Sequence, residues 1–421
     1  MILVSGELIE NIKQEEVISS LKERIYKTLK TQTPPSVETV INACDALYKK
    51  VMNHEYDDII LPLLKSLNIP YSMLDRYASY FSKEGLTKKV EIELGDLVKG
   101  KKPLDGSNYY SIAPLGILFH IAAGNVDLLP AYSVIEGLLA GNINILKLPS
   151  GDNGLSVKLL KELLDIEPSL KDYIYVFDVP STEVETIKQL SDLSDATIVW
   201  GGDKACKAAR EFVDIHSRII EWSHKISFSY IDKNVTDEEL KSLANSICQT
   251  NQLLCSSSQG IYVDTDNEED FAKIAERFIS IFGDISKESN TLPFTMKAKN
   301  SLTIYNEKLE GRGKGIYQKN GVSVRVLLDN KLETSFLFQD VWVKPLKHEN
   351  IIDVLKPNKS LIQTVSVNEN IANRDKVFEL LSKVGAVRIV RLGDNSRMIA
   401  GESHDGKYAL REYTRIVETY K

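Results

Sequence analysis

The chain has 421 residues, 43% of them hydrophobic and 26% charged, which is the composition of an ordinary globular protein with two or more domains. Its formal net charge is −7 and it has no lysine- and arginine-rich block, so we expect no nucleic-acid partner. The four cysteines (Cys44, Cys206, Cys248, Cys255) form no CxxC pair, which argues against a disulfide framework or a metal site and favours the reducing cytoplasm.

The N-terminal part predicts helices and no targeting segment. MILVSGELIENIKQEE lacks the basic start and apolar core of a signal peptide, and no apolar run is long enough for an integral membrane segment. Residues 1 to 90 show helical spacing at Ile18, Leu21, Ile25 and Leu29, and again over Val37–Lys50 and Ile59–Leu67. Residues 88–107 predict a linker or a short hairpin.

Strands and helices alternate from Pro114 onward. The predicted strands are Ile117–Ala122, Ile143–Leu148, Tyr173–Phe177 and Thr197–Trp200, and the predicted helices are Leu129–Ala140, Gly154–Leu164 and Asp203–Val213. Such alternation is typical of βαβ units, which build an α/β fold with a parallel sheet and ligands at the carboxyl ends of the strands.

A second α/β region begins near Asp232. The sequence Thr236-x-x-Glu239 predicts a capping box that opens a helix. Further predicted helices are Phe271–Phe282 and Arg374–Val384, and predicted strands are Gly260–Val263, Leu302–Tyr305, Val322–Leu327 and Val387–Val390. The expected organisation is a helical region with a linker over 1–110 that packs on the next domain, a nucleotide-binding domain over 111–232, a catalytic domain over 233–390 and a C-terminal tail over 391–421.

Cys255 and Glu221 are candidate catalytic residues. Cys255, in NQLLCSSSQG, lies between a helix end and a strand, where a thiol can face a cleft as a nucleophile, although buried structural cysteines are common. Glu221 precedes an alternating strand and could act as a general base, but a lone glutamate is more often a surface charge.

Three further positions could bind an oxyanion or a nucleotide. Asn125 follows an apolar strand, where its amide could stabilise an oxyanion or cap the next helix. Lys147 ends a predicted strand where parallel sheets meet nucleotides, unless it is a solvent-exposed lysine. Gly201–Gly202 opens a helix and permits close approach of a phosphate, but a double glycine alone is a weak signal.

The order of these features resembles the aldehyde dehydrogenase superfamily. NQLLC resembles the nucleophile motif N-Q-x-x-C, EWSHK the base motif E-L-G-G-K, and IVWGGD the glycine turn beside the cofactor pyrophosphate. The resemblance implies a Rossmann-type cofactor domain and an α/β catalytic domain. It also implies an oxyanion role for Asn125 and a ribose-binding role for Lys147.

Over residues 110–421 the chain looks most like long-chain acyl-CoA reductases of the LuxC type. Asp340, in FQDVWVKPL, occupies the place of the acidic cofactor residue of that family. Ser150 stands where NAD-preferring relatives carry a ribose-binding glutamate, so the resemblance implies NADPH, with NADH as the alternative. Cys206 stands where many relatives have a second glycine in the cofactor turn.

The resemblance implies reduction of a long-chain acyl-CoA or acyl-protein thioester to the aldehyde through a Cys255 thioester, with CoA as the leaving group. Implied partners are the acyl donor, a fatty-acid-activating subunit and a second copy of the chain, with a dimer as the default. Two other functions stay open. One is an NAD-dependent hydrolytic aldehyde dehydrogenase that uses Glu221, and the other is a non-catalytic subunit that holds an acyl group or acts as a scaffold.

Overall fold

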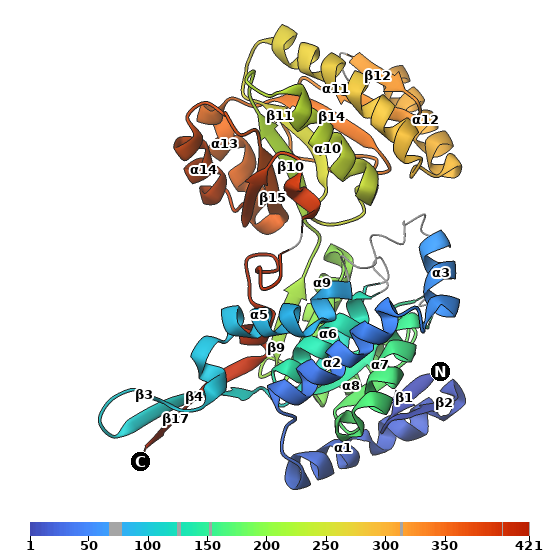
Figure 1. The fold of residues 1–421 in the computed structure, drawn as a ribbon, viewed down its shortest axis with the longest axis vertical. Coiled ribbons are helices and arrows are strands. Elements are labelled where there is room, and N and C mark those ends of the chain that lie inside the picture. The colour runs from blue at the N-terminus through green and yellow to red at the C-terminus, as the bar shows by residue number, and fades with distance from the viewer. Residues whose placement is uncertain (67–77, 124–127, 151–153, 312–314, 398, 421) are drawn as a thin grey trace. The chain divides into compact units, whose positions relative to one another are not determined.

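A seven-stranded sheet forms the centre of the first of two units, which spans Met1–Ser66, Pro70–Ser223 and Ile399–Lys421. The structure is a computed structural model that describes residues 1–66, 78–123, 128–150, 154–311, 315–397 and 399–420. The strands of this sheet are β2 (Glu7–Ile9), β1 (Ile2–Val4), β7 (Ile174–Phe177), β6 (Ile143–Lys147), β5 (Ile117–Ile121), β8 (Ala196–Trp200) and β9 (Arg218–Trp222), in that order. Figure 1 labels β1, β2 and β9 among them.

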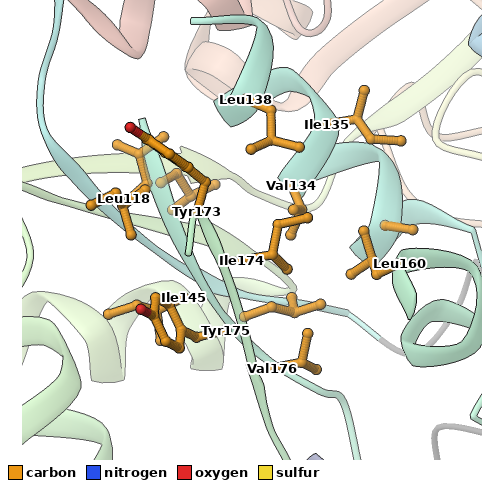
Figure 2. Close-up of a cluster of buried hydrophobic side chains, with 14 of the residues drawn as sticks. Leu118, Val134, Ile135, Leu138, Ile145, Leu160, Tyr173, Ile174, Tyr175 and Val176 are labelled. Atoms are coloured by element: carbon orange, nitrogen blue, oxygen red, sulfur yellow. The ribbon is translucent and has the colours of Figure 1, made fainter. Parts of the chain in front are cut away.

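The strands from β7 to β9 are parallel, and a helix follows β5, β6, β7 and β8 in turn, which confirms the predicted α/β alternation. The helices of this unit are α1 (Gln14–Thr31), α2 (Val37–Met52), α3 (Asp57–Ser66), α5 (Lys83–Glu93), α6 (Leu129–Leu139), α7 (Leu155–Ile166), α8 (Val184–Asp192), α9 (Asp203–Phe212) and α15 (Ala409–Glu412). Figure 2 shows Leu118, Ile145 and Ile174 from adjacent strands, with Val134 and Leu160 from α6 and α7 nearby.

The N-terminal residues contribute strands as well as helices, which differs from the all-helical prediction for residues 1 to 90. β1 pairs antiparallel with β7, and its three residues are fully buried. A run of three apolar residues is too short to show periodicity, so its pairing partner decides its structure. Leu21 of α1 and Val40 of α2 belong to the same apolar core as the sheet, so the N-terminal helices pack against the rest of the first unit.

The C-terminal residues form a strand that pairs with a distant part of the chain, where the sequence predicted a tail. β17 (Thr414–Tyr420) pairs antiparallel with β4 (Asn108–Pro114) along its whole length, and β3 (Lys102–Pro103) completes a three-stranded sheet. Most residues of β17 are exposed or only partly buried. Such a strand has a weak hydrophobic pattern, so its sequence does not predict it without knowledge of the strand with which it pairs.

The second unit spans His224–Met398 and contains another seven-stranded sheet. Its strands, in order, are β12 (Gly315–Lys319), β13 (Val322–Val326), β14 (Asp340–Pro345), β11 (Ser258–Val263), β10 (Ile226–Ile231), β15 (Ile362–Val367) and β16 (Arg388–Arg391). Because β10 lies in this sheet, the unit begins at His224, earlier than the expected boundary after residue 232.

The helices of the second unit are α10 (Asp237–Thr250), α11 (Glu268–Ser289), α12 (Phe294–Leu309), α13 (Ile351–Leu355) and α14 (Arg374–Lys383). Thr236 and Glu239 form the predicted capping box of α10. Short 3₁₀ helices across both units are η1 (Asn11–Lys13), η2 (Ser79–Phe81), η3 (Gly95–Lys99), η4 (Pro168–Leu170), η5 (His348–Asn350), η6 (Lys356–Leu361) and η7 (Asp394–Ser396).

The predicted strand Leu302–Tyr305 is wrong, because these residues lie in α12. The helix buries Asn300, Ile304 and Glu307, which recur at helical spacing, while Leu302 and Tyr305 are exposed. A four-residue run that contains three large apolar side chains does not distinguish a strand from a helix.

Among the described residues, no helix has both the length and the apolar character that a membrane crossing needs.

Candidate functional site

Cys255 lies on the short loop that joins α10 to β11, and it is exposed. β10, β11 and β14 are parallel neighbours and all begin near this loop, so Cys255 lies at the amino-terminal edge of the second sheet. The Ser227 hydroxyl donates a 2.7 Å hydrogen bond to the backbone carbonyl of Cys255. The same hydroxyl oxygen accepts from the Thr364 amide at 3.0 Å, so strands β10 and β15 both hold the loop in place.

The two residues that open the NQLLC motif anchor this loop. Asn251 and Gln252 both have positive φ angles, 46° and 62°, in the left-handed region that asparagine tolerates and that reverses the chain after α10. The buried Gln252 side chain donates to the carbonyl oxygens of Ser258 and Asp340 at 3.0 and 2.8 Å and accepts from the Gln339 amide at 2.9 Å. The chain therefore fixes both ends of the cysteine loop with buried polar side chains.

Exposure separates Cys255 from the other three cysteines, which are buried. Burial raises the pKa of Cys44 to about 12, and it does the same for Cys248, where a hydrogen bond from Ser289 opposes the shift. A thiol with such a pKa stays protonated at neutral pH and is a poor nucleophile. Cys255 is therefore the one of the four cysteines whose side chain is exposed to solvent.

Glu221 is held by an arginine that the sequence did not single out. Its carboxylate forms a two-point ion pair with Arg210 of α9, with 2.8 Å between Nε and Oε1 and 2.5 Å between Nη2 and Oε2. Successive residues of a strand point to opposite faces of the sheet. Glu221 pairs with Val199, which packs against α9, so Glu221 lies on the face that α9 covers. The next residue, Trp222, stacks on Trp200 on the other face. A general-base role for Glu221 requires this pair to open.

The first sheet places a set of cofactor candidates along its carboxyl edge. The strand order reverses between β5 and β8, and ligands of such sheets bind in the crevice at this point. Lys147 ends β6; it is buried, and burial lowers the pKa of its amine, with Asp178 opposing the shift. Ser150 lies three residues after Lys147 and is exposed. Its Oγ atom lies 3.4 Å from the Oγ atom of Ser181.

Gly201 and Gly202 form the turn between β8 and α9. Gly202 is the N-cap of α9, no side chain caps it, and a Cβ atom at this position would meet nothing within 4 Å. The open space in front of a ten-residue helix N-terminus suits a phosphate. Cys206 is buried, and its Sγ lies 3.7 Å from the Gly201 carbonyl oxygen, so the thiol contacts the backbone of this turn.

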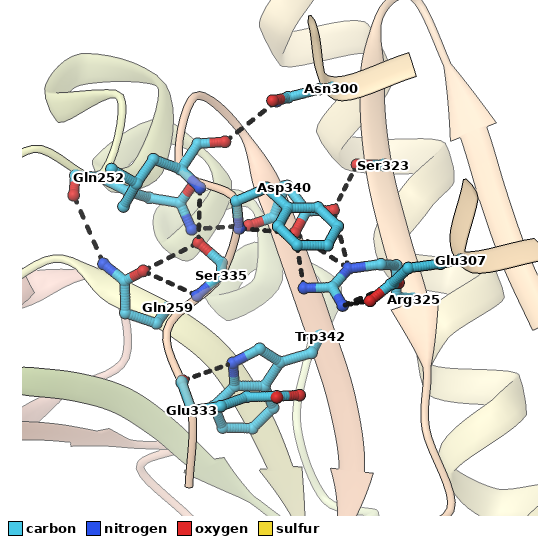
Figure 3. Close-up of polar contacts among 12 residues, drawn as sticks. Gln252, Gln259, Asn300, Glu307, Ser323, Arg325, Glu333, Ser335, Asp340 and Trp342 are labelled. Carbon is cyan, nitrogen blue, oxygen red and sulfur yellow. Dashed lines mark hydrogen bonds and ion pairs between the residues drawn. The ribbon is translucent and has the colours of Figure 1, made fainter. Parts of the chain in front are cut away.

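Asp340, which was predicted to bind the cofactor, is held by other residues of the second unit. The Asp340 side chain at the start of β14 is fully buried, with an exposed fraction of 0%. Its carboxylate accepts hydrogen bonds from Arg325 at 2.8–3.1 Å, from the Ser323 hydroxyl at 2.6 Å and from the Phe336 amide at 3.1 Å (Figure 3). Arg325 also pairs with Glu307 at 3.1 Å. These contacts engage both carboxylate oxygens of Asp340 within the second unit, so a cofactor-binding role requires some of them to be exchanged.

Asn125 lies outside the described residues, in the segment between β5 and α6. On the neighbouring elements, Ser133 Oγ lies 2.7 Å from His120 Nδ1, and His120 Nε2 lies 3.0 Å from Asn144 Oδ1. This serine–histidine–asparagine chain is completely buried, and burial lowers the pKa of His120 to about 4, with the Asn144 hydrogen bond opposing the shift. It therefore ties β5, β6 and α6 together and offers no accessible nucleophile.

The sequence did not indicate three residues that bind the predicted site residues. Arg210 pairs with Glu221, Arg325 pairs with Asp340, and Ser227 donates a hydrogen bond to the backbone of Cys255. Arg210 lies 11 residues before its partner Glu221, and Ser227 lies 28 residues before Cys255. No local pattern links such pairs, because they come together only through the packing of separate elements. Asn251 and Gln252 had a signal, since they are part of the motif that identified Cys255.

Comparison with known proteins supports the resemblance and extends it. The sequence profile of the family described as "Acyl-CoA reductase (LuxC)" matches residues 32–416, so the similarity includes most of the N-terminal helical region. Long-chain acyl-protein thioester reductase 2 of Photobacterium leiognathi is 29% identical over 74% of this chain and 66% of the relative. The corresponding reductase of Aliivibrio fischeri is 28% identical over 80% of this chain and 71% of the relative. The chain thus spans about two thirds of the length of the first of these relatives.

Solved structures establish the fold. The glyceraldehyde-3-phosphate dehydrogenase GapN of Methanocaldococcus jannaschii, solved with NADP, superposes with a TM-score of 0.70 at 13% identity, over 99% of this chain and 95% of that one. Aldehyde dehydrogenase 21 of Physcomitrella patens superposes with a TM-score of 0.69 at 12% identity, over 96% of this chain and 90% of that one. The chain therefore has the aldehyde dehydrogenase fold.

Proposed function

This chain belongs to the LuxC family of acyl-CoA reductases, and on that premise we propose that it reduces a long-chain acyl thioester to the aldehyde through a thioester on Cys255. The observation that supports this proposal most directly is the exposed Cys255 on a loop that buried side chains hold at both ends. The relatives are named for acyl-protein thioesters and the family for acyl-CoA, so both donors are proposed substrates.

In the proposed reaction, the Cys255 thiolate attacks the acyl carbonyl carbon, and the C–S bond to the donor breaks. The donor thiolate, CoA or a carrier-protein thiol, leaves and takes up a proton. The backbone N–H of Cys255 and the amide of Asn125 are the proposed donors to the oxyanion. A nicotinamide cofactor, when bound, would supply a hydride to the carbonyl carbon of the Cys255 thioester, which would then be at the thiohemiacetal level. Cleavage of the bond to Sγ then releases the aldehyde and restores the thiolate.

The carboxyl edge of the first sheet fits a dinucleotide. Lys147 ends β6 and Ser150 follows it, and the uncapped N-terminus of α9 has open space at Gly202, which together suit a ribose and a pyrophosphate. An exposed serine at position 150 carries no negative charge that would repel a 2′-phosphate. We therefore propose NADPH as the preferred cofactor, with NADH as the alternative.

Replacing Ser150 by glutamate is expected to lower kcat/KM for NADPH by at least about tenfold and to change that for NADH by less than about threefold. The reason is that a carboxylate close to a 2′-phosphate repels it by one to several kcal/mol. Steady-state kinetics with both cofactors measure the effect. Ser169→Glu adds the same charge at an exposed site beyond α7, between the helix and the start of β7, and is the matched control. Equal losses for NADPH and NADH would contradict the assignment.

The Arg210–Glu221 pair is proposed to protect the acyl-enzyme from hydrolysis. Arg210→Met is expected to raise the release of free fatty acid from the acyl-enzyme at least about tenfold, because a freed general base accelerates water attack by roughly 10²–10⁴-fold. Single-turnover assays without NADPH measure this release. Adding Glu221→Gln to Arg210→Met is expected to restore slow hydrolysis. If Glu221→Gln alone abolishes a rapid hydrolysis in the unmodified chain, Glu221 already acts as a base and the hydrolytic dehydrogenase is favoured.

The function itself is tested with the purified chain, NADPH, and long-chain acyl-CoA or acyl carrier protein. The expected result is one aldehyde and one free thiol for each NADPH consumed, with the aldehyde trapped as a hydrazone and identified by mass spectrometry. Conversion of a long-chain aldehyde to the acid with NAD⁺, without reduction of any thioester, would establish the hydrolytic dehydrogenase in its place.

A further inference from the structure

The helix α12 (Phe294–Leu309) turns a row of apolar side chains toward solvent. The exposed fraction is 84% for Phe294, 64% for Leu302, 59% for Tyr305 and 70% for Leu309. With the exposed Ala298 between the first two, these residues recur every three or four positions, a spacing that aligns side chains along one side of a helix. Single exposed apolar residues are ordinary on a protein surface, but a continuous row of them marks an interaction surface. We call these five residues the apolar stripe of α12.

The opposite side of α12 is mostly polar, although it faces the protein. Of the three buried residues of this helix, Ile304 alone is apolar. Asn300 donates 3.1 Å hydrogen bonds to two backbone carbonyl oxygens of the segment that precedes β14, and Glu307 pairs with Arg325 at 3.1 Å. A surface helix of a globular protein normally turns its apolar side to the core. In α12 this arrangement is inverted, so the second unit holds the helix largely by polar contacts and leaves the apolar stripe for a partner.

Lysines lie on both margins of the apolar stripe. At about 100° per residue around the helix axis, Lys299 lies on one side of the stripe, and Lys297 and Lys308 lie on the other. Lys299 and Lys308 are exposed, and none of the three lysines forms an ion pair with another residue in the described part of the chain. The C-cap residue Glu310 is the one exposed acidic side chain of this segment. The margins of the stripe therefore carry a net positive charge.

We propose that α12 binds the surface of a lipid bilayer that contains anionic lipids. The apolar stripe enters the boundary between headgroups and acyl chains, and the lysines contact the phosphate groups. A helix with aromatic and leucine side chains on one side and lysines beside them binds membranes in this way. Each lysine near an anionic surface strengthens such binding. Figure 1 shows α12 at one margin of the second unit, near the edge strand β12.

A second copy of the chain fits this surface less well. Most soluble oligomers are symmetric, and a two-fold axis through the stripe would set the lysines of one copy against those of the other. Like charges at short distance oppose such a contact, whereas phosphate headgroups attract the same lysines. The inference goes beyond the proposed function and does not depend on it, because exposure and charge alone support it.

The test is cosedimentation of the full chain with vesicles at low ionic strength. Vesicles of equal parts phosphatidylcholine and phosphatidylglycerol are expected to bind the chain at least about tenfold more tightly than vesicles of phosphatidylcholine alone, and added salt is expected to remove most of this difference. Lys299→Gln with Lys308→Gln is expected to weaken binding to the mixed vesicles by about fivefold per lysine. Leu302→Ser is expected to weaken it at least about fivefold, because the membrane no longer buries the leucine side chain.

Exposed residues elsewhere in the second unit give matched controls. Lys376→Gln with Lys383→Gln removes the same charge from α14, where the two side chains are 54% and 57% exposed. Leu328→Ser removes an exposed leucine that follows β13. Both controls are expected to bind the mixed vesicles within about twofold of the unmodified chain, since neither site belongs to the proposed contact.

No binding, equal binding to both kinds of vesicle, or equal losses in the stripe and control variants overturns the inference. Sedimentation velocity without vesicles tests the rival partner, and Leu302→Ser is expected to leave the oligomeric state unchanged. A dimer that Leu302→Ser dissociates would assign the stripe to a second copy and overturn lipid binding there. These assays contain no acyl donor, so their failure leaves the proposed function intact, and failure of the chain to reduce a thioester leaves this inference intact.

Discussion

Replacing Cys255 by alanine is expected to abolish acyl thioester reduction, with kcat at least about 10³-fold below that of the unmodified chain. Without the thiol, the acyl group cannot be transferred from the donor to the protein, so the thioester that the hydride would reduce does not form. The direct measurement is intact-protein mass after incubation with tetradecanoyl-CoA in the absence of NADPH. The unmodified chain is expected to gain one acyl group, which Cys255→Ala does not gain.

Cys248→Ala is the control for this prediction. Cys248 lies on α10, seven residues before Cys255, but it is buried and burial raises the pKa of its thiol to about 12. The control variant is therefore expected to become acylated and to reduce the donor like the unmodified chain. Acylation of Cys255→Ala would place the nucleophile elsewhere. If Cys255→Ala loses activity but still supports the cellular role of the chain, the scaffold function is favoured.

Replacing Arg325 by methionine is expected to lower the free energy of unfolding of the second unit by about 3–5 kcal/mol. The arginine is 1% exposed and pairs with the buried carboxylates of Asp340 and Glu307, and the ring of Phe336 covers its guanidinium at 4.1 Å. Methionine keeps most of the volume but leaves two carboxylates without their positive partner. Urea unfolding followed by tryptophan fluorescence reports this loss, because Trp342 is fully buried in the same unit.

Arg277→Met is the matched control in the same unit. Arg277 pairs with Asp237 at 2.7 Å, but both side chains are exposed, and such surface pairs contribute under about 1 kcal/mol. A loss of less than about 1 kcal/mol in Arg325→Met would contradict a structural role for Asp340 and would favour its role in cofactor binding. The double variant Arg325→Met/Asp340→Asn is expected to recover part of the loss, since it removes one of the two unpaired charges.

The sequence predicted most elements of both units, because their signals are local. The βαβ alternation from Ile117 to Phe212 depends on hydrophobic period and turn residues, and the capping box at Thr236 involves a contact only three residues away. The order of the short motifs was enough to identify the family, since each motif is read within a few residues. The candidate residues at Cys255, Lys147 and Gly202 follow from the same local patterns.

The tertiary structure decided which residues that are distant in the sequence contact one another, because local patterns contain no information on such contacts. Glu221 and Asp340 were both predicted as carboxylates that act on ligands, yet Arg210 holds the first and Arg325 with Ser323 occupies the second. The same holds for β1 and β17, short or exposed strands whose structure depends on β7 and β4 far along the chain. Charge pairing and strand pairing act through space, so a residue's partners depend on which elements pack together. The sequence by itself therefore determined most elements, the family and the candidate nucleophile Cys255, while the packing of those elements determined which partners the candidate carboxylates have.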